Sequence, residues 1–189
     1  LALTDFAKYR YPSALELSPD SRYLTFALKD VDREGDGYRW NLWLYDLERR
    51  ESRQITRGDD QRKAVWEDNT HILYKTTEPD KAMRARGFEE EWTVYHRLNV
   101  CTGEDREAFR LPMSVSGLWK MDEGRYVFTG ETHLDRPNLL ELTGEALEKE
   151  LVRRQQTRGY KVLTELPLCE NGVGMFNQTR NTLFLYLEA

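Results

Sequence analysis

Short apolar runs separated by polar turns recur along the whole chain. The clearest example, from Leu17 to Lys29, reads LSPDSRYLTFALK, in which a Ser-Pro-Asp turn leads into a run of aromatic and β-branched residues. Apolar runs bounded by turn residues are typical of β-strands. The pattern therefore predicts a protein built mainly of short strands.

Weaker copies of this phrase return around Asp68, Asp122 and Asn177, with a period of about fifty residues. Each copy is expected to form an apolar strand, a polar turn and a second apolar strand. The expected strand pairs are 14–17 with 23–28, 63–66 with 71–76, 115–119 with 126–129, and 173–176 with 183–187. Third and fourth strands are expected at 41–47 and 52–56 in the first copy, and at 93–100 and 107–111 in the second.

A repeat of this period with four strands in each unit is typical of propeller blades. The predicted fold class is therefore all-β, a single domain over residues 1–189 forming a partial β-propeller of about three and a half four-stranded antiparallel blades. The expected blades cover residues 11–58, 61–112 and 114–167, with a partial fourth blade at 170–189.

The third copy diverges after Thr132. The run HLDRPNLL is expected to supply a strand, residues 143–156 a short helical insertion, and residues 160–166 an outer strand. Thr143 suits the N-cap of the helix. The helix is expected to carry a short apolar stripe formed by Leu147, Leu151 and Val152. Two ion pairs between residues four positions apart are also expected, Glu145–Lys149 and Glu150–Arg154.

Composition narrows the choice of partners. Aromatic residues make up 12% of the chain, and the net charge is −5 without a basic stripe, so nucleic acid is not expected as a partner. Cys101 and Cys169 lie far apart without CxxC spacing, which favours free thiols in a reducing cytoplasm over a disulfide or a zinc site. The expected location is therefore cytoplasmic.

No apolar window reaches the length of a membrane span, and no signal peptide is evident, although a removed signal stays open. No membrane partner is expected. The chain begins with Leu1 rather than Met and stops at Ala189 directly after the apolar run LFLYLE, so both ends are expected to have been cut.

Four segments resemble the N-terminal propeller of bacterial serine peptidases of the prolyl oligopeptidase family, the acylaminoacyl peptidases or dipeptidyl aminopeptidases. They are LTDFAKYRYPSALELSPDSRYLTFALKDVD, NLWLYDLERRESRQITRGDDQRKAVWEDNTHILY, SGLWKMDEGRYVFTGETHLDRPNLLEL and NGVGMFNQTRNTLFLYLE. The resemblance implies a propeller that precedes an α/β-hydrolase domain and restricts its Ser-Asp-His triad to short peptides. Ser21 stands where such turns commonly carry Gly, so a turn without an obligatory positive φ is expected there.

The chain itself is expected to hold no catalytic residue, no metal and no cofactor. None of its serines lies in a G-x-S-x-G nucleophile elbow; Ser116 comes nearest but falls in an expected strand. His71, His96 and His133 are isolated from one another in sequence and are expected to be structural or surface residues.

Glu89 and Glu90 are the candidate substrate-binding residues. With Glu91 they interrupt the second copy, and they resemble the acidic pair with which dipeptidyl peptidases of this family hold a substrate's positively charged N-terminus. Carboxylates bind an ammonium group by charge-assisted hydrogen bonds. The alternative is a solvated acidic run balanced by Arg84 and Arg86.

The tryptophans raise the alternative of a stacking platform for a sugar or peptide. Trp43, Trp66 and Trp119 fall inside expected strands, where packing between blades is the simpler role. Trp40 and Trp92 lie at strand entries, and their roles stay open.

The expected function is therefore the non-catalytic, access-gating propeller of a serine peptidase, with the hydrolase domain and short peptides as partners. A TolB-like propeller that binds proteins without enzymatic activity is the alternative. A sugar-binding or lyase propeller would need clustered histidines or metal ligands, which are not found. An incomplete propeller exposes blade faces and strand edges, so self-association, with two half-rings closing on each other, is also expected.

Overall fold

The computed structural model describes residues 8–32, 35–133, 136–157, 169–170, 174–175 and 179–188. The chain divides into two compact units. Unit 1 comprises Leu1–Glu78, Thr93–Arg110 and Trp119–Glu123, and unit 2 comprises Pro79–Trp92, Leu111–Leu118 and Gly124–Ala189. Within the described ranges, no helix is both long and apolar enough to cross a lipid bilayer.

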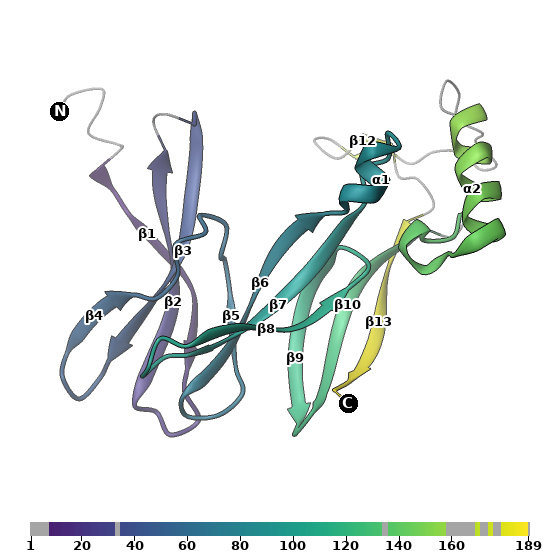
Figure 1. Cartoon of the computed structure of the whole chain (residues 1–189). Helices are drawn as coiled ribbons and strands as arrows, with labels where there is room; N and C mark the ends of the chain where they lie inside the picture. Colours follow the sequence, from purple (N-terminus) through teal and green to yellow (C-terminus); the bar gives the residue numbers. More distant parts are fainter. Residues whose placement is uncertain are drawn as a thin grey trace. The chain divides into compact units, whose positions relative to one another are not determined.

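The first antiparallel sheet has four strands in sequence order (Figure 1). These are β1 (Tyr11–Leu17), β2 (Tyr23–Asp32), β3 (Gly37–Asp46) and β4 (Glu51–Gln54). The strands expected in the first copy are thus confirmed, with β1, β2 and β3 longer than predicted and β4 ending at Gln54. Aromatic and β-branched residues fill these strands because large flat side chains pack well on a pleated surface.

The turn between β1 and β2 contains an unusual backbone angle. Ser21 has a φ of 60°, so the turn takes a positive φ at this position although the residue is not glycine. Asp20 stabilises this turn, because its carboxylate accepts hydrogen bonds from Ser18 Oγ at 2.6 Å and from the Arg22 amide at 3.1 Å. The side chain of Asp20 therefore supports a conformation that glycine usually supplies.

The second sheet repeats the same order with four strands, which confirms the second copy. These are β5 (Ala64–Trp66), β6 (His71–Pro79), β7 (Glu91–Asn99) and β8 (Asp105–Leu111). A short helix that the sequence did not predict, α1 (Lys81–Ala85), lies between β6 and β7.

The core of unit 1 lies between the first and second sheets. It is formed by side chains from both sheets that are at most 9% exposed, namely Ala27, Leu42, Leu44, Ala64, Trp66, Ile72, Tyr74, Leu98 and Val100. Trp66 extends the contact, because its indole N–H donates to Glu16 O at 3.1 Å and its ring stacks on Tyr23. The expected packing role of Trp66 is therefore confirmed.

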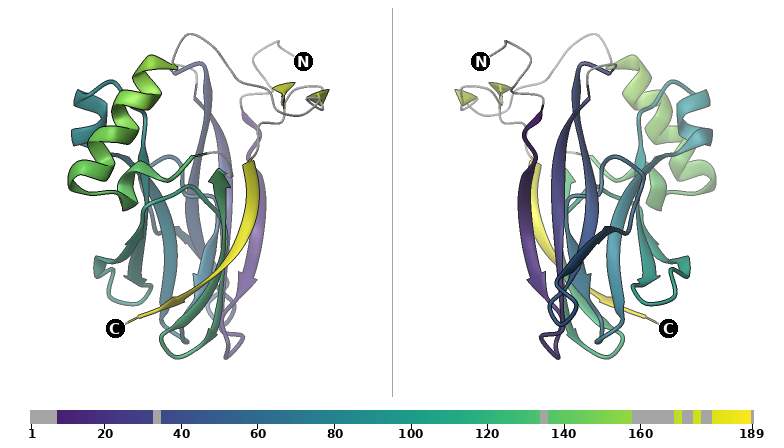
Figure 2. Two further views of the ribbon diagram at one scale, coloured as in Figure 1. Left: turned by 90° about the vertical axis from the view of Figure 1, so that its right-hand side faces the viewer. Right: turned by 90° about the vertical axis from the view of Figure 1, so that its left-hand side faces the viewer.

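The third sheet contains a strand that the sequence assigned to another blade. Its order is β13-β10-β9, with β9 at Val115–Asp122, β10 at Arg125–His133 and β13 at Thr179–Leu187 (Figures 1 and 2). All nine residues of β10 pair with β13. The prediction that residues 183–187 belong to a fourth blade was therefore wrong.

β13 was assigned to another blade because a long segment separates it from β10 in the sequence. This segment contains the 3-10 helix η2 (Leu139–Glu141), the helix α2 (Gly144–Gln156) and the two-residue strands β11 (Cys169–Glu170) and β12 (Gly174–Met175). The prediction of a strand in HLDRPNLL was also wrong, because η2 occupies the end of this segment. Asn138 stabilises η2, since its side-chain oxygen accepts a hydrogen bond from the Leu140 amide at 3.0 Å. The expected strand at 160–166, parts of the one at 173–176, and Asn177 lie outside the described residues.

The helical insertion itself is confirmed. α2 begins after Thr143, which occupies the N-cap position without a capping hydrogen bond from its side chain. Both expected ion pairs form, Glu145–Lys149 at 2.7 Å and Glu150–Arg154 at 3.0 Å. Leu147 and Leu151 pack inward as expected, but Val152 is 52% exposed.

Unit 2 has a small core of its own where α1 meets α2. The two helices lie side by side (Figures 1 and 2). Met83 of α1, Leu139 of η2 and Leu151 of α2 are each at most 8% exposed and form one cluster, with Phe88 packed against it. The insertion after β6 and the excursion after β10 therefore pack together as one helical element.

Candidate functional site

The segment that carries Glu89 and Glu90 is a loop closed at its base by Asp80. The Asp80 carboxylate caps α1 by accepting from the Met83 amide at 2.9 Å, and it also accepts from the indole N–H of Trp92 at 2.8 Å. The Trp92 and Met83 N–H groups together lower the pKa of Asp80. The Asp80 amide donates to Glu90 O at 2.7 Å, so both ends of the loop are joined.

An ion pair joins this loop to α2. Arg86 and Glu148 form two parallel hydrogen bonds of 2.9 and 2.7 Å, the bidentate geometry favoured by guanidinium and carboxylate groups. Arg86 lowers the pKa of Glu148, although burial acts in the opposite direction. The side chains of Arg86 and Glu148 are 40% and 60% exposed, so solvent screens the pair and it contributes little to stability.

Arg154 of α2 approaches the same loop from the inside. Its side chain is 11% exposed, and it donates to Glu90 Oε1 at 2.8 Å, to Glu150 Oε1 at 3.0 Å and to Pro137 O at 2.5 Å. Arg153 also pairs with Glu150, and these two arginines lower the pKa of Glu150. A nearly buried guanidinium group therefore lies between two carboxylates that compensate its charge.

A pocket of about 410 Å³ in unit 2 lies against these elements. Of its described lining residues, five are acidic and two are arginines: Glu89, Glu90, Glu91, Glu131 and Glu141, with Arg136 and Arg154. The excess of carboxylates favours a cationic group in the pocket.

The structure thus brings the two predicted substrate-binding residues to one pocket. Glu89 is exposed, and its carboxylate has no hydrogen bond or ion pair with another described residue. Glu90 is half-buried and engaged with Arg154. Their role in binding stays a prediction. The contact between Arg154 and Glu90 was not predicted, because no pattern in the sequence indicates it.

The three histidines lie in separate surroundings. His96 stacks on Tyr74 and lies 3.5 Å from an oxygen of Asp105, and His133 lies 3.1 Å from a nitrogen of Arg136. All six serines and all three histidines are described, and no serine side chain bonds a histidine there. Ser116 lies in β9, as expected, with its hydroxyl 2.8 Å from that of Thr129.

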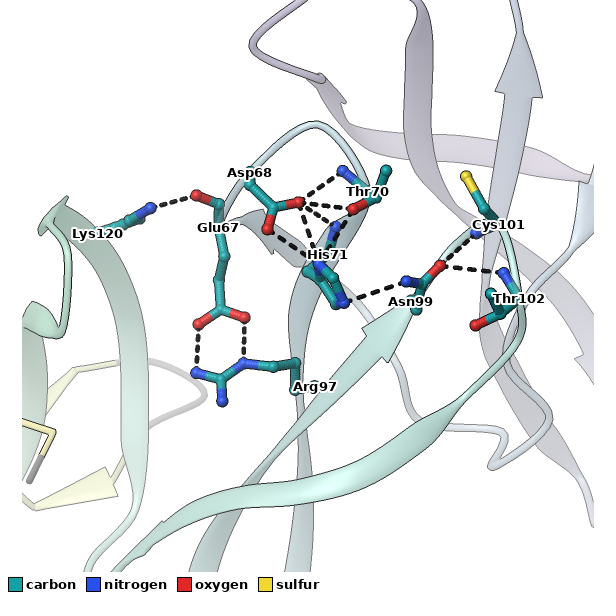
Figure 3. Close-up of polar contacts among 9 residues, drawn as sticks. All are labelled: Glu67, Asp68, Thr70, His71, Arg97, Asn99, Cys101, Thr102 and Lys120. Atoms are coloured by element: carbon teal, nitrogen blue, oxygen red, sulfur yellow. Dashed lines mark hydrogen bonds and ion pairs between the residues drawn. The ribbon is translucent and has the colours of Figure 1, made fainter.

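His71 belongs to a polar network that joins two turns of the second sheet (Figure 3). Asp68 lies 2.9 Å from His71 Nδ1 and accepts from the amides of Thr70 and His71 at 2.7 Å each. His71 Nε2 lies 3.1 Å from the Asn99 side-chain nitrogen, and Asn99 Oδ1 accepts from the amide of Cys101. These contacts give His71 a structural role.

A buried ion pair lies beside this network. Glu67 and Arg97 form two hydrogen bonds of 2.5 and 2.7 Å and are 9% and 18% exposed. Lys120 donates to the backbone oxygen of Glu67 (Figure 3). The turn before β6 is therefore bonded to both β7 and β9.

The remaining tryptophans divide between packing and polar roles. Trp43 stacks on Phe26 within the first sheet. Trp119 is 49% exposed, so the prediction that it packs between blades was wrong for the described residues. Trp40 lies beneath the Arg62 guanidinium group, and Trp92 bonds Asp80.

Comparison with known proteins adds the fold relationship. No protein-family model matches the sequence, and a search of curated proteins finds no match. Among solved structures, acylaminoacyl peptidase from Pyrococcus horikoshii matches with a TM-score of 0.63 and 12% identity, over 97% of this chain and 24% of that chain. Acylaminoacyl peptidase in complex with Z-Gly-Gly-Phe-chloromethyl ketone matches with 0.63 and 11% identity, over 98% and 24%. The free AtxE2 isopeptidase matches with 0.54 and 13% identity, over 93% and 28%.

The chain is a partial β-propeller. Two four-stranded antiparallel sheets packed face to face in unit 1, and a third sheet of three described strands, agree with this fold. Identities of 11–13% relate the propeller to these proteins by fold, and it spans about a quarter of their length.

Proposed function

We propose that this propeller is the non-catalytic, access-gating part of a serine peptidase of the prolyl oligopeptidase family that hydrolyses short peptides in the cytoplasm. The nucleophile, its histidine and its aspartate belong in this proposal to an α/β-hydrolase domain outside the chain. The proposal is supported by the likeness to acylaminoacyl peptidase over 97% of the chain. It is also supported by the acidic pocket beside the two insertions.

The pocket would bind the ammonium group of a short peptide. Glu89 is exposed and has a carboxylate available for charge-assisted hydrogen bonds, whereas Arg154 already neutralises part of the charge on Glu90. Glu89 would therefore contribute the larger part of the binding, and Glu90 would fix the wall of the pocket. A folded protein would be excluded by size, because only a free chain end enters a pocket of about 410 Å³.

The substitution Glu89→Gln in the whole peptidase tests this role. It keeps the shape of the side chain and removes its charge, so KM for free-amine dipeptide substrates should rise about tenfold, while KM for N-acetylated substrates should stay unchanged. Glu145→Gln is a matched control, since Glu145 is an exposed residue of α2. If the E89Q enzyme has the same KM as the wild type for free-amine substrates, the proposed ammonium site is contradicted.

A second measurement tests the parent activity. A fluorophosphonate probe should label one serine of the whole protein outside residues 1–189 and should leave the isolated chain unlabelled. A whole protein that stays unlabelled would instead support the TolB-like, protein-binding alternative.

A further inference from the structure

The side chain of Asn99 has one possible orientation in the turn between β7 and β8. One atom of its amide lies 2.9 Å from the Cys101 backbone nitrogen and 3.0 Å from that of Thr102 (Figure 3). Both backbone groups are N–H donors, so this atom must be the amide oxygen. The amide nitrogen, with its two hydrogens, therefore faces the ring of His71.

This orientation fixes where the imidazole ring of His71 carries its hydrogen. His71 Nε2 lies 3.1 Å from the Asn99 amide nitrogen, which can only donate, so Nε2 accepts with its lone pair. Nδ1 then carries the hydrogen and donates to the Asp68 carboxylate at 2.9 Å. The Thr70 hydroxyl, 3.1 Å from Nδ1, itself donates to Asp68 at 3.0 Å. A neutral His71 therefore bonds the turn before β6 with one nitrogen and the turn after β7 with the other.

A second proton on the ring would break the bond to Asn99. Imidazole is the side chain that ordinarily gains a proton between pH 8 and 5, and the His71 side chain is 34% exposed, so solvent can supply the proton. The new Nε2–H would point at the N–H groups of Asn99. If the Asn99 amide turned over, those hydrogens would instead point at the Cys101 and Thr102 amides. No orientation of the amide satisfies both sides, and an unmade hydrogen bond is costly.

A protonated His71 would stay with Asp68 and release Asn99. The bond from Nδ1 to Asp68 is kept, and it gains the attraction between opposite charges. Burial would raise the pKa of Asp68, but hydrogen bonds from the amides of Thr70 and His71 outweigh it and lower the pKa to about 2. Asp68 is therefore a carboxylate throughout the range in which the ring gains its proton.

The other charged groups of this network are bonded elsewhere (Figure 3). Glu67 and Arg97 pair with each other, and Lys120 donates to the backbone oxygen of Glu67. The thiol of Cys101 lies 3.8 Å from the Tyr23 hydroxyl. The charge that bonds the ring directly is thus that of the carboxylate in the turn before β6.

We propose that His71 and Asn99 form a pH-sensitive switch that holds the turn 99–104. The turn is held while Nε2 accepts from Asn99, and protonation of Nε2 releases it. This turn joins the two sheets of unit 1, because Val100 is 1% exposed in the core between them and its backbone oxygen accepts from Arg53, next to β4 residue Ser52. Acidification should therefore loosen the contact between the first and second sheets at this turn.

NMR of the 189-residue chain tests the state of the ring. Long-range proton–nitrogen spectra at pH 7.5 should show His71 with its hydrogen on Nδ1, and a ring with the hydrogen on Nε2 would overturn the proposal. Hydrogen exchange of the Val100, Cys101 and Thr102 amides, corrected for its intrinsic pH dependence, measures the release. Protection should fall about fivefold between pH 7.5 and 5, the factor for one ordinary hydrogen bond. Its midpoint should match that of the His71 ring resonances, and protection that stays constant while His71 titrates would contradict the switch.

Asn99→Asp should reverse the sign of the pH effect. One carboxylate oxygen would still accept from the Cys101 and Thr102 amides, and the other would accept from a protonated Nε2 of His71. Protection should therefore rise, rather than fall, as the pH is lowered. A folded N99D chain in which protection falls as in the wild type would rule the switch out.

His71→Gln should abolish the pH effect, because glutamine does not titrate. His96→Gln is the matched control, since His96 is a partly exposed histidine of the same sheet, on β7, and its loss should leave the wild-type response unchanged. Circular dichroism and thermal melting check that the variants are folded. The proposal fails if a folded H71Q chain keeps the wild-type response, or if the H96Q chain loses it.

Discussion

At the scale of single residues, Asp68 illustrates how one carboxylate organises a turn. Partial burial alone would raise its pKa, but hydrogen bonds from the Thr70 and His71 amides and from the His71 side chain outweigh burial and lower the pKa to about 2. An unfolded chain has an Asp pKa of about 3.9. Because the folded pKa lies below the unfolded one, the stabilisation is present above about pH 4 and is lost as the pH falls towards 2.

Asp68→Asn should therefore reduce the free energy of unfolding near neutral pH. The loss should be about 1 kcal/mol, since more than half of the Asp68 side chain is exposed and solvent screens its interactions. The difference between wild type and variant should shrink as the pH falls from 4 to 2.5. Urea unfolding of both proteins at several pH values measures it, and a difference that does not vary with pH would contradict the assignment.

The candidate site shows how far single residues could be predicted. An acidic run that interrupts a repeat predicts Glu89 and Glu90 as site residues, and both line the pocket. Arg154 was expected only to pair with Glu150 along the helix. Its contact with Glu90 could not be anticipated, because the two residues are 64 positions apart and each has the type of an ordinary surface charge.

At the scale of elements, the two helical insertions depend on a few shared apolar side chains. Leu151 of α2 is 3% exposed and packs with Met83 of α1 and Leu139 of η2. Deletion of buried methyl groups removes contacts from every element that shares the cluster. The insertions should therefore loosen together.

Leu151→Ala should destabilise this cluster by about 2–4 kcal/mol. Hydrogen exchange should accelerate in both α1 and α2 and change little in β2 and β3, whose core lies in unit 1. Val152→Ala is the control, because Val152 is exposed on the same helix. Faster exchange in α2 alone would show that the helices do not share one core.

The strands that could be predicted are those paired with their sequence neighbours. The first and second sheets follow the chain in order, so apolar runs and turn residues sufficed to locate them. β13 pairs with β10 across a long excursion, and its apolar run has the form of a new hairpin. Pairing between distant strands depends on tertiary packing, here Phe128 on Phe184, which no local pattern encodes.

At the scale of the whole molecule, the net charge of −5 opposes association of two copies. The pI is about 5.4, so repulsion between copies decreases as the pH falls from 7 towards that value. At an ionic strength of about 0.01 M, where the Debye length is about 30 Å, the second virial coefficient of the chain in solution should fall as the pH drops from 7 to 5.5. At about 0.15 M the change should nearly vanish. Sedimentation equilibrium in both salts measures it, and an equal pH effect in both would exclude charge repulsion as the cause.

Both helical excursions leave a sheet after its second strand and return to supply the third, α1 between β6 and β7 and α2 between β10 and β13. The register of each sheet is set by pairs outside the excursion, so this connection can be lengthened or exchanged while the strands keep their partners. Segments from other proteins grafted between residues 80 and 91 should therefore change the lining of the pocket while β6 and β7 keep their order in the sheet. The crossing from second to third strand is the place where such a chain can change its surface at the least cost to its strand pairing.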